Sequence, residues 1–253
     1  MKIFRLFIIT LIAIGFASCT VLSPKETVTT PESQPTTNQT QTLSMQDYFP
    51  LHQGAYWVYE GPIRWTKINS TEVVEETIRW KMEVVRVIQR GDVTGFEMLG
   101  APSDLAWYDD NKQRTSYAYI LTGGKIYQMP VDTLQRLADE SDTLYELVSE
   151  TSEFFNIPLM NGQKICATEQ ITRIDGIHCW YVSSFQDAEP LTINGVQISS
   201  PVEEYMLTKM TGPDRSDIGF IPGIGISRYH YVHNGVIAEA DLQLIEYFPG
   251  ESD

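Results

Sequence analysis

The dominant pattern in this 253-residue chain is a series of short β-rich runs separated by turn dipeptides. Residues 57–59, 77–88 and 96–99 are rich in aromatic and β-branched side chains, and in the longest run apolar residues alternate with charged ones. Hairpin signals occur at Arg90-Gly91-Asp92, Gly123-Gly124, Asp175-Gly176, Asn194-Gly195 and Asn234-Gly235. The chain is therefore predicted to be mainly β, as a curved antiparallel sheet or half-barrel.

One segment departs from this pattern. Residues 131–150 follow Pro130, begin with the capping candidates Asp132 and Thr133, and carry leucines at helical spacing. This segment is predicted to form one or two helices.

An internal repeat flanks the helical segment. Pro50-Leu51-x-x-Gly54 and Pro158-Leu159-x-x-Gly162 match at an offset of about 108 residues, and each precedes a predicted strand. The repeat favours two similar β halves joined by a helical connection. A chance match of three identities remains the alternative at the level of sequence.

The N-terminus carries an export signal. Lys2 and Arg5 precede an apolar run over 6–16, which is shorter than the ~20 residues that a membrane-spanning helix needs. Ala17-Ser18-Cys19 then resembles the lipobox of bacterial lipoproteins, although Phe16 replaces the usual Leu. The resemblance implies that residues 1–18 are a signal peptide and that Cys19 is diacylated and begins the mature chain.

Residues 19–45 comprise this cysteine and a predicted tether. Positions 20–44 contain 8 Thr, 3 Ser, 3 Pro and 3 Gln and no aromatic residue, so they cannot bury enough apolar surface to fold. Residues 46–253 are predicted to form a single antiparallel β domain. The protein is thus expected to be exported and lipid-anchored to a bacterial membrane, at the outer face of the cell membrane or at the outer membrane.

The start of the core carries a second resemblance. The pattern from Asp47-Tyr48-Phe49-Pro50-Leu51 through Gly54, Trp57, Tyr59 and Gly61 resembles the opening of many uncharacterised bacterial lipoproteins and secreted β domains, and Pro222-Gly223-Ile224-Gly225 resembles their close. This resemblance implies no activity. At the level of fold alone, a curved sheet that holds a helix also resembles periplasmic lipoprotein carriers and receptors of the LolA and LolB type.

Cys166 and Cys179 form an even pair in an exported chain, which favours a disulfide. A two-residue turn at Asp175-Gly176 conflicts with this bond, because it places Cys166 opposite Phe185 and separates the cysteines by about 20 Å of strand. Either the chain folds back near residues 167–170, or the two cysteines are free and buried.

Catalytic signatures are sparse. The sequence contains no G-x-S-x-G elbow, Walker loop, H-E-x-x-H motif or Cys/His cluster. His230 and His233 lie three apart in a predicted strand, so they point to opposite faces and make a poor metal pair. We therefore predict no enzyme activity, no metal and no cofactor.

The net charge of the chain and two neighbouring aromatic residues indicate which partners to expect. A net charge of -15 argues against nucleic acid. The expected partners are the membrane, through the N-terminal lipid, and an envelope protein or an apolar ligand. Trp107 and Tyr108 lie in loop-like sequence and are candidate binding residues.

Three functions fit these observations. The first is a lipoprotein with a non-catalytic binding or structural β domain in the cell envelope. The second is a carrier or sensor that holds an apolar ligand in a curved sheet, and the third is a cell-surface hydrolase. A hydrophobic cavity of several hundred cubic ångströms, lined by inward-facing strand residues, would favour the carrier.

Overall fold

The computed structural model describes residues 45–139, 143–148, 152–166, 178–185, 190–198 and 203–250. They belong to one compact unit, Thr42–Asp253. Cys19, the predicted signal peptide and nearly all of the predicted tether lie outside the described residues, as does Asp175-Gly176.

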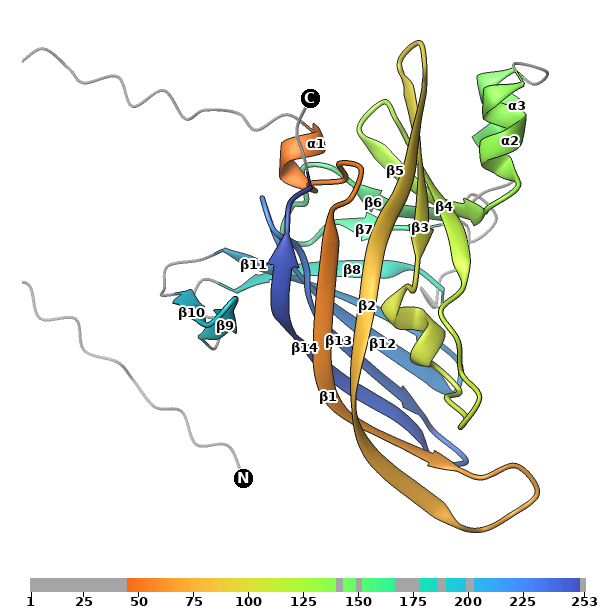
Figure 1. Ribbon diagram of the computed structural model, residues 1–253, viewed down its shortest axis with the longest axis vertical. Helices are drawn as coiled ribbons and strands as arrows, with labels where there is room; N and C mark the ends of the chain where they lie inside the picture. The colour runs from red at the N-terminus through yellow and green to blue at the C-terminus, as the bar shows by residue number, and fades with distance from the viewer. Residues whose placement is uncertain are drawn as a thin grey trace, which may run out of the picture. The chain divides into compact units, whose positions relative to one another are not determined.

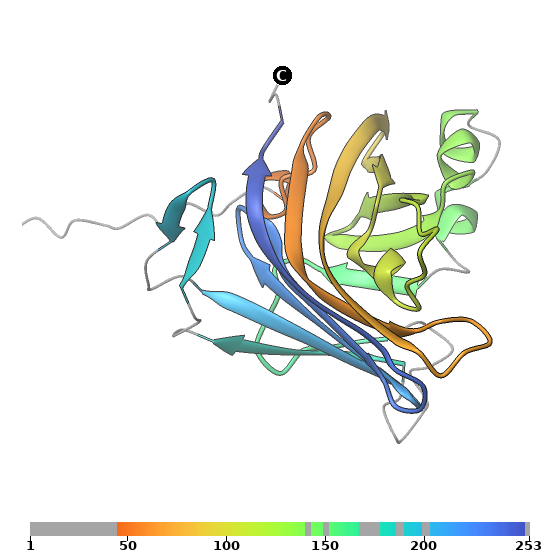
Figure 2. The same cartoon turned by 60° about the horizontal axis from the view of Figure 1, so that its bottom comes forward.

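Twelve strands form one antiparallel sheet that curves until it is nearly closed into a barrel (Figures 1 and 2). The first half comprises β1 Tyr56–Thr66, β2 Val73–Arg90, β3 Val93–Leu99, β4 Ser116–Thr122, β5 Lys125–Pro130 and β6 Ser152–Asn156. The second half comprises β7 Lys164–Ile165, β8 Trp180–Phe185, β11 Glu204–Thr211, β12 Asp214–Ile221, β13 Gly225–His233 and β14 Ala238–Phe248. The predicted curved antiparallel sheet is confirmed.

The strand order shows how the halves join. The order is β6-β5-β4-β3-β2-β1-β14-β13-β12-β11-β8-β7, so each half is a six-stranded meander and the first and last strands pair at the centre. A long β1–β14 ladder, from Tyr56↔Phe248 to Trp65↔Ala238, joins them. The strands β6 and β7 are left at the two ends of the order.

The glycine of the Pro-Leu-x-x-Gly repeat makes an equivalent backbone hydrogen bond in both halves, although the peptide bond before Pro158 is cis and the one before Pro50 is not. Gly54 N–H donates to the Val84 carbonyl at 3.0 Å, and Gly162 N–H donates to the Val182 carbonyl at 2.8 Å. Both glycines have a φ of 80°, a left-handed conformation that favours glycine. The repeat therefore marks two similar turns, each of which precedes the first strand of a half.

One end of the barrel is filled by aromatic side chains. The ring of Phe49 packs edge-on against Trp57, Phe155 and Phe220, with ring centroids 5.2–5.8 Å apart, and all four residues are fully buried. The short helix α1, Met45–Tyr48, which the sequence pattern did not predict, leads into this cluster. Gly225 permits the close packing, since a Cβ at this position would lie 2.8 Å from Phe49 Cε2.

The predicted helical segment forms two short helices, α2 Thr133–Ala138 and α3 Leu144–Val148. They lie outside the barrel (Figure 1), and α2 contacts β2 and β3. Leu134, Leu137 and Leu147 pack there with Val93 and Ile120. A separate hairpin of β9 Leu191–Ile193 and β10 Val196–Ile198 lies beside β14 on the other side of the molecule (Figure 2).

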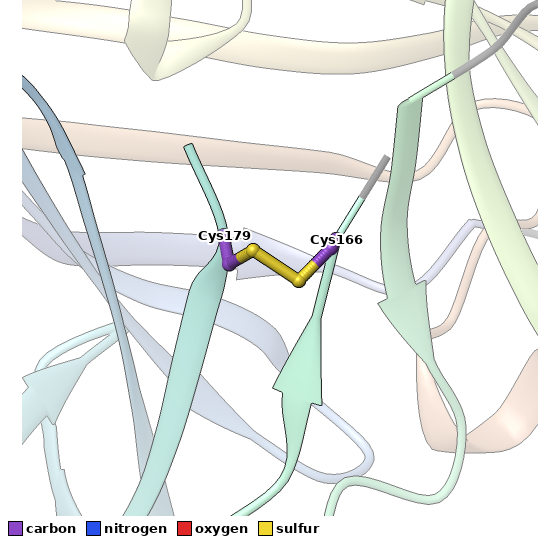
Figure 3. Close-up of a disulfide and its surroundings, with 2 residues drawn as sticks. All are labelled: Cys166 and Cys179. Carbon is purple, nitrogen blue, oxygen red and sulfur yellow. A yellow bond between two sulfur atoms is a disulfide. The ribbon is translucent and has the colours of Figure 1, made fainter. Parts of the chain in front are cut away.

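Cys166 and Cys179 form a disulfide with a Cα–Cα distance of 4.4 Å (Figure 3). The disulfide that the even cysteine pair favours is therefore confirmed, and the strands do not adopt the register that a two-residue turn at Asp175-Gly176 would impose. Lys164 pairs with Tyr181 and Ile165 with Trp180, so the next residues outward, Cys166 and Cys179, face each other. A longer connection between β7 and β8 accounts for the difference.

Candidate functional site: a cavity inside the barrel

A cavity of about 320 Å³ lies within the curve of the sheet. It is bounded by β4, β5 and β6 of the first half and by β8, β11, β12 and β13 of the second. Its lining consists of Ala101, Pro102, Ser103, Ala106, Trp107, Tyr119, Gln128, Glu153, Phe154, Trp180, Lys209, Thr211, Asp214, Ser216, Ile218, Ile226, Tyr229 and Tyr231. Inward-facing strand residues therefore form most of its wall.

The β11–β12 register orders this wall by depth. Leu207 pairs with Ile218, Lys209 with Ser216, and Thr211 with Asp214. Ile218 lies toward the aromatic cluster that fills one end of the barrel, whereas Asp214 begins its strand at the opposite end. The cavity thus changes from an apolar inner part to a polar outer part.

The connection between β3 and β4 forms one side of the cavity. Its 3-10 turn η1, Pro102–Leu105, lies inside the curve of the sheet (Figure 2), and Leu105 is buried. The Trp80 indole N–H donates to the carbonyls of Gly100 at 3.0 Å and Ala101 at 3.2 Å. These bonds fix the connection to β2 and so fix the position of Trp107.

Trp107 lies at the outer part of the cavity. It is 49% exposed, and its ring lies 4.2 Å from the His233 ring, centroid to centroid. Its φ of 56° is uncommon for a large side chain. Tyr108 does not line the cavity, since its ring packs edge-on against buried Trp65 at 4.8 Å.

Asp214 is held by three side chains. Its carboxylate accepts hydrogen bonds from Tyr231 Oη at 2.7 Å, His233 Nδ1 at 2.8 Å and Thr211 Oγ1 at 3.0 Å. Burial raises the pKa of Asp214, but these hydrogen bonds outweigh it and leave the pKa below its ordinary value. The acceptor capacity of the carboxylate is thus largely used within the protein.

His233 is bonded to Asp214 through Nδ1 and is not part of the cavity lining. The other ring nitrogen of His233 faces Gly235, since a Cβ on that glycine would lie 2.8 Å from Nε2. The hydroxyl of Ser216 is hydrogen-bonded to Tyr229.

Lys209 projects from the middle of β11 into the cavity wall. Its ammonium lies 5.4 Å from the centroid of the Trp180 ring, the residue that it faces across the β8–β11 pair. Burial lowers the pKa of Lys209. Among the described residues, no carboxylate forms an ion pair with this lysine.

The remaining charged group of the lining is neutralised by a neighbour. Glu153 on β6 lies 2.7 Å from Lys125 Nζ on β5. Lys209 is therefore a lining cation that has no ion-pair partner among the described residues.

The outer face of the same strands carries a separate polar cluster. Asp217 accepts hydrogen bonds from Thr208 at 2.6 Å, Arg215 Nε at 2.9 Å and His230 Nδ1 at 3.3 Å. The hydrogen bond to Asp217, which outweighs the effect of burial, raises the pKa of His230. As expected for positions three apart on a strand, His230 and His233 have different partners.

The predicted site residues can now be placed. Trp107 lines the cavity, Tyr108 supports a core tryptophan, and Cys19 is not described. The sequence interpretation missed Lys209 and Asp214. Lys209 could have been found from the alternation Tyr205, Leu207, Lys209, which places a cation on the apolar face of a strand.

No group of three or more His, Cys, Asp and Glu side chains is placed to hold a metal ion in the described part of the chain. No helix in the same residues is long and apolar enough to cross a membrane.

No protein-family model and no curated protein matches the chain. Two solved structures are similar to it. One is a presumed exported protein with a YmcC-like fold from Bacteroides fragilis, with 10% identity, coverage of 79% of this chain and 98% of that chain, and a TM-score of 0.36. The other is a presumed lipoprotein from Parabacteroides distasonis, with 11% identity, the same coverage and a TM-score of 0.38. These similarities are too low to support an argument about function.

Proposed function

We propose that this protein is an envelope lipoprotein, anchored through acylated Cys19, whose β domain binds a small apolar ligand without transforming it. The observation that carries the proposal is the cavity of about 320 Å³ inside the sheet. This volume lies at the lower end of the range of ligand sites, roughly 300–1,000 Å³. The binding module and the apolar-ligand carrier predicted from the sequence thereby become one proposal.

The composition of the wall supports an apolar ligand. Phe154, Trp180, Ile218 and Ile226 are buried residues whose side chains line the cavity. Several polar groups of the wall are bonded within the protein, since Asp214 accepts hydrogen bonds from Thr211 and Tyr231 and Glu153 pairs with Lys125. Ligand sites of this kind use apolar contact for affinity and polar groups for orientation.

Binding can be tested with the neutral fluorophore N-phenyl-1-naphthylamine. The protein is the mature chain from residue 19 with Cys19→Ser, produced under oxidising conditions, so that no attached acyl chain competes. We expect saturable binding with one site per chain. Gln128→Trp should abolish it by filling the cavity, because Gln128 lines the wall from β5.

Gln243→Trp is the matched control, because Gln243 is exposed on β14 and does not line the cavity. Non-saturable binding, or equal binding by both tryptophan variants, would contradict the proposal. Turnover of a cell-wall glycan or ester by the purified protein would contradict its non-catalytic part.

The anchor requires its own test in cells. Replacing Cys19 with Ser in the full-length chain removes the acylated sulfur, so the variant should leave the membrane fraction. A variant that stays as firmly bound as the parent would show that Cys19 is not the anchor.

A further inference from the structure

We infer that the ligand of this cavity is an anionic amphiphile, with an apolar body and one negatively charged group that pairs with Lys209. The inference rests on the proposed ligand-binding function and adds the chemical class of the ligand. Three observations support this inference: the charges on the cavity wall, the depth of Lys209 in the cavity, and the packing of its ammonium against Trp180.

The first observation concerns charge compensation. Of the three charged groups on the wall, Glu153 is paired with Lys125, and Asp214 accepts three hydrogen bonds. Within the described part of the chain, the Lys209 ammonium lies over the face of Trp180 and has no carboxylate partner. An ammonium partly withdrawn from water without an anion is costly, so its presence in this wall points to a partner that the described residues do not supply.

The second observation concerns depth. Lys209 pairs with Ser216 across the β11–β12 ladder. The Thr211–Asp214 pair lies nearer the outer end of the cavity, and the Leu207–Ile218 pair lies nearer the inner end. An anion at Lys209 is therefore below the outer end of the cavity, and the apolar body of the same ligand can occupy the inner part beside Ile218 and Ile226.

The third observation concerns geometry. Trp180 is 7% exposed, and it holds the ammonium against its ring at 5.4 Å. A cation placed in this way keeps N–H donors for a carboxylate, sulfonate or phosphate oxygen. The same side chain pair thus provides one charged contact and one flat apolar contact for the ligand.

Two fluorophores that differ by a single anionic group provide the test. N-phenyl-1-naphthylamine is neutral, and 8-anilinonaphthalene-1-sulfonate has the same ring skeleton with one sulfonate. Dissociation constants for both are measured with the mature Cys19→Ser chain and with the same chain carrying Lys209→Met. We expect Lys209→Met to weaken the sulfonate probe at least tenfold relative to the neutral probe.

Two further variants complete the design. Lys209→Arg keeps the charge and should retain the preference for the sulfonate. Lys164→Met is the matched control, because Lys164 also lies over an aromatic ring, that of Tyr181 at 5.6 Å, but both residues are exposed and outside the cavity. It should leave both dissociation constants unchanged.

The outcomes separate the two proposals. If the parent chain binds the neutral probe and Lys209→Met changes both probes equally, the cavity binds ligands but the anionic class is wrong. The same conclusion follows if Lys209→Arg loses the preference for the sulfonate. If the parent chain binds neither probe, both the proposed function and this inference are wrong.

Discussion

Breaking the Cys166–Cys179 disulfide should destabilise the protein by about 3 kcal/mol. The bond closes a loop with a sequence separation of 13 residues, and loop-closure entropy for a loop of roughly 15 residues gives about 3 kcal/mol at 25 °C. For a domain of this size, that loss corresponds to a fall in Tm of about 6–12 °C. The bond also matters for the site, because Cys179 directly precedes Trp180 of the cavity wall.

The assay compares three samples by urea denaturation: the oxidised chain, the same chain after reduction, and a Cys166→Ala/Cys179→Ala variant. Reduction keeps both sulfur atoms, so it isolates the effect of the covalent bond from the loss of packing at buried Cys179. Equal free energies of unfolding for the oxidised and reduced chains would refute the reasoning, because the disulfide would then not destabilise the unfolded state.

Three further predictions follow from burial and charge. Trp107→Ala should lower the free energy of unfolding by less than about 1 kcal/mol, because the ring is half-exposed, whereas Trp57→Ala in the core should cost about 3–5 kcal/mol. His230→Gln should lower the free energy of unfolding below about pH 6.5, where the imidazolium of the parent is stabilised by Asp217. The difference between the parent and the variant should disappear as the pH rises through the raised pKa of His230 in the folded state. Lys209→Met should have a higher free energy of unfolding than the parent near pH 7, because the parent must bury a charged ammonium. This difference should shrink as the pH rises from the lowered pKa of Lys209 in the folded state toward its unfolded value of about 10.5.

Denaturation curves at a series of pH values check all three. Equal losses for the two tryptophan variants would place Trp107 in the core. A constant difference between the parent and His230→Gln from about pH 5 to pH 9 would show that Asp217 does not stabilise the imidazolium. A Lys209→Met chain that is less stable than the parent at every pH would mean that the Lys209–Trp180 contact outweighs the cost of burying the charge.

The fold could be predicted because its signals are local. Alternation within residues 77–88 and the glycine dipeptides between strands specify hairpins from a few neighbouring residues, and the structure has turns at Gly91 and at Gly123-Gly124 as predicted. The sequence left the β7–β8 register open, because the turn signal at Asp175-Gly176 conflicts with a Cys166–Cys179 disulfide. The observed pairing of Lys164 with Tyr181 agrees with the disulfide and spans a longer connection.

The site was harder to predict because it is assembled from distant segments. Trp107 could be proposed from its loop-like surroundings, but its neighbour His233 comes from the far end of the chain. Lys209 becomes notable only when Trp180 and the paired Glu153 are placed around it, and one sequence gives no pairing of β8 with β11. The four residues of α1 are likewise too few to show a helical period.

The two outermost strands have a mechanical consequence for the size of the ligand. Among the described residues, β6 pairs only with β5 and β7 only with β8, so no backbone ladder joins β6 to β7. Phe154 and Trp180, which line the cavity on this side, touch edge to face with centroids 5.8 Å apart. Separating β6 from β7 would break this ring contact and the hydrogen bond from Gln163 Nε2 to the Asn156 carbonyl at 3.4 Å, whereas separating any other neighbouring strands of the sheet would break ladder hydrogen bonds. We therefore expect a ligand larger than the resting cavity to be accommodated along the line between β6 and β7.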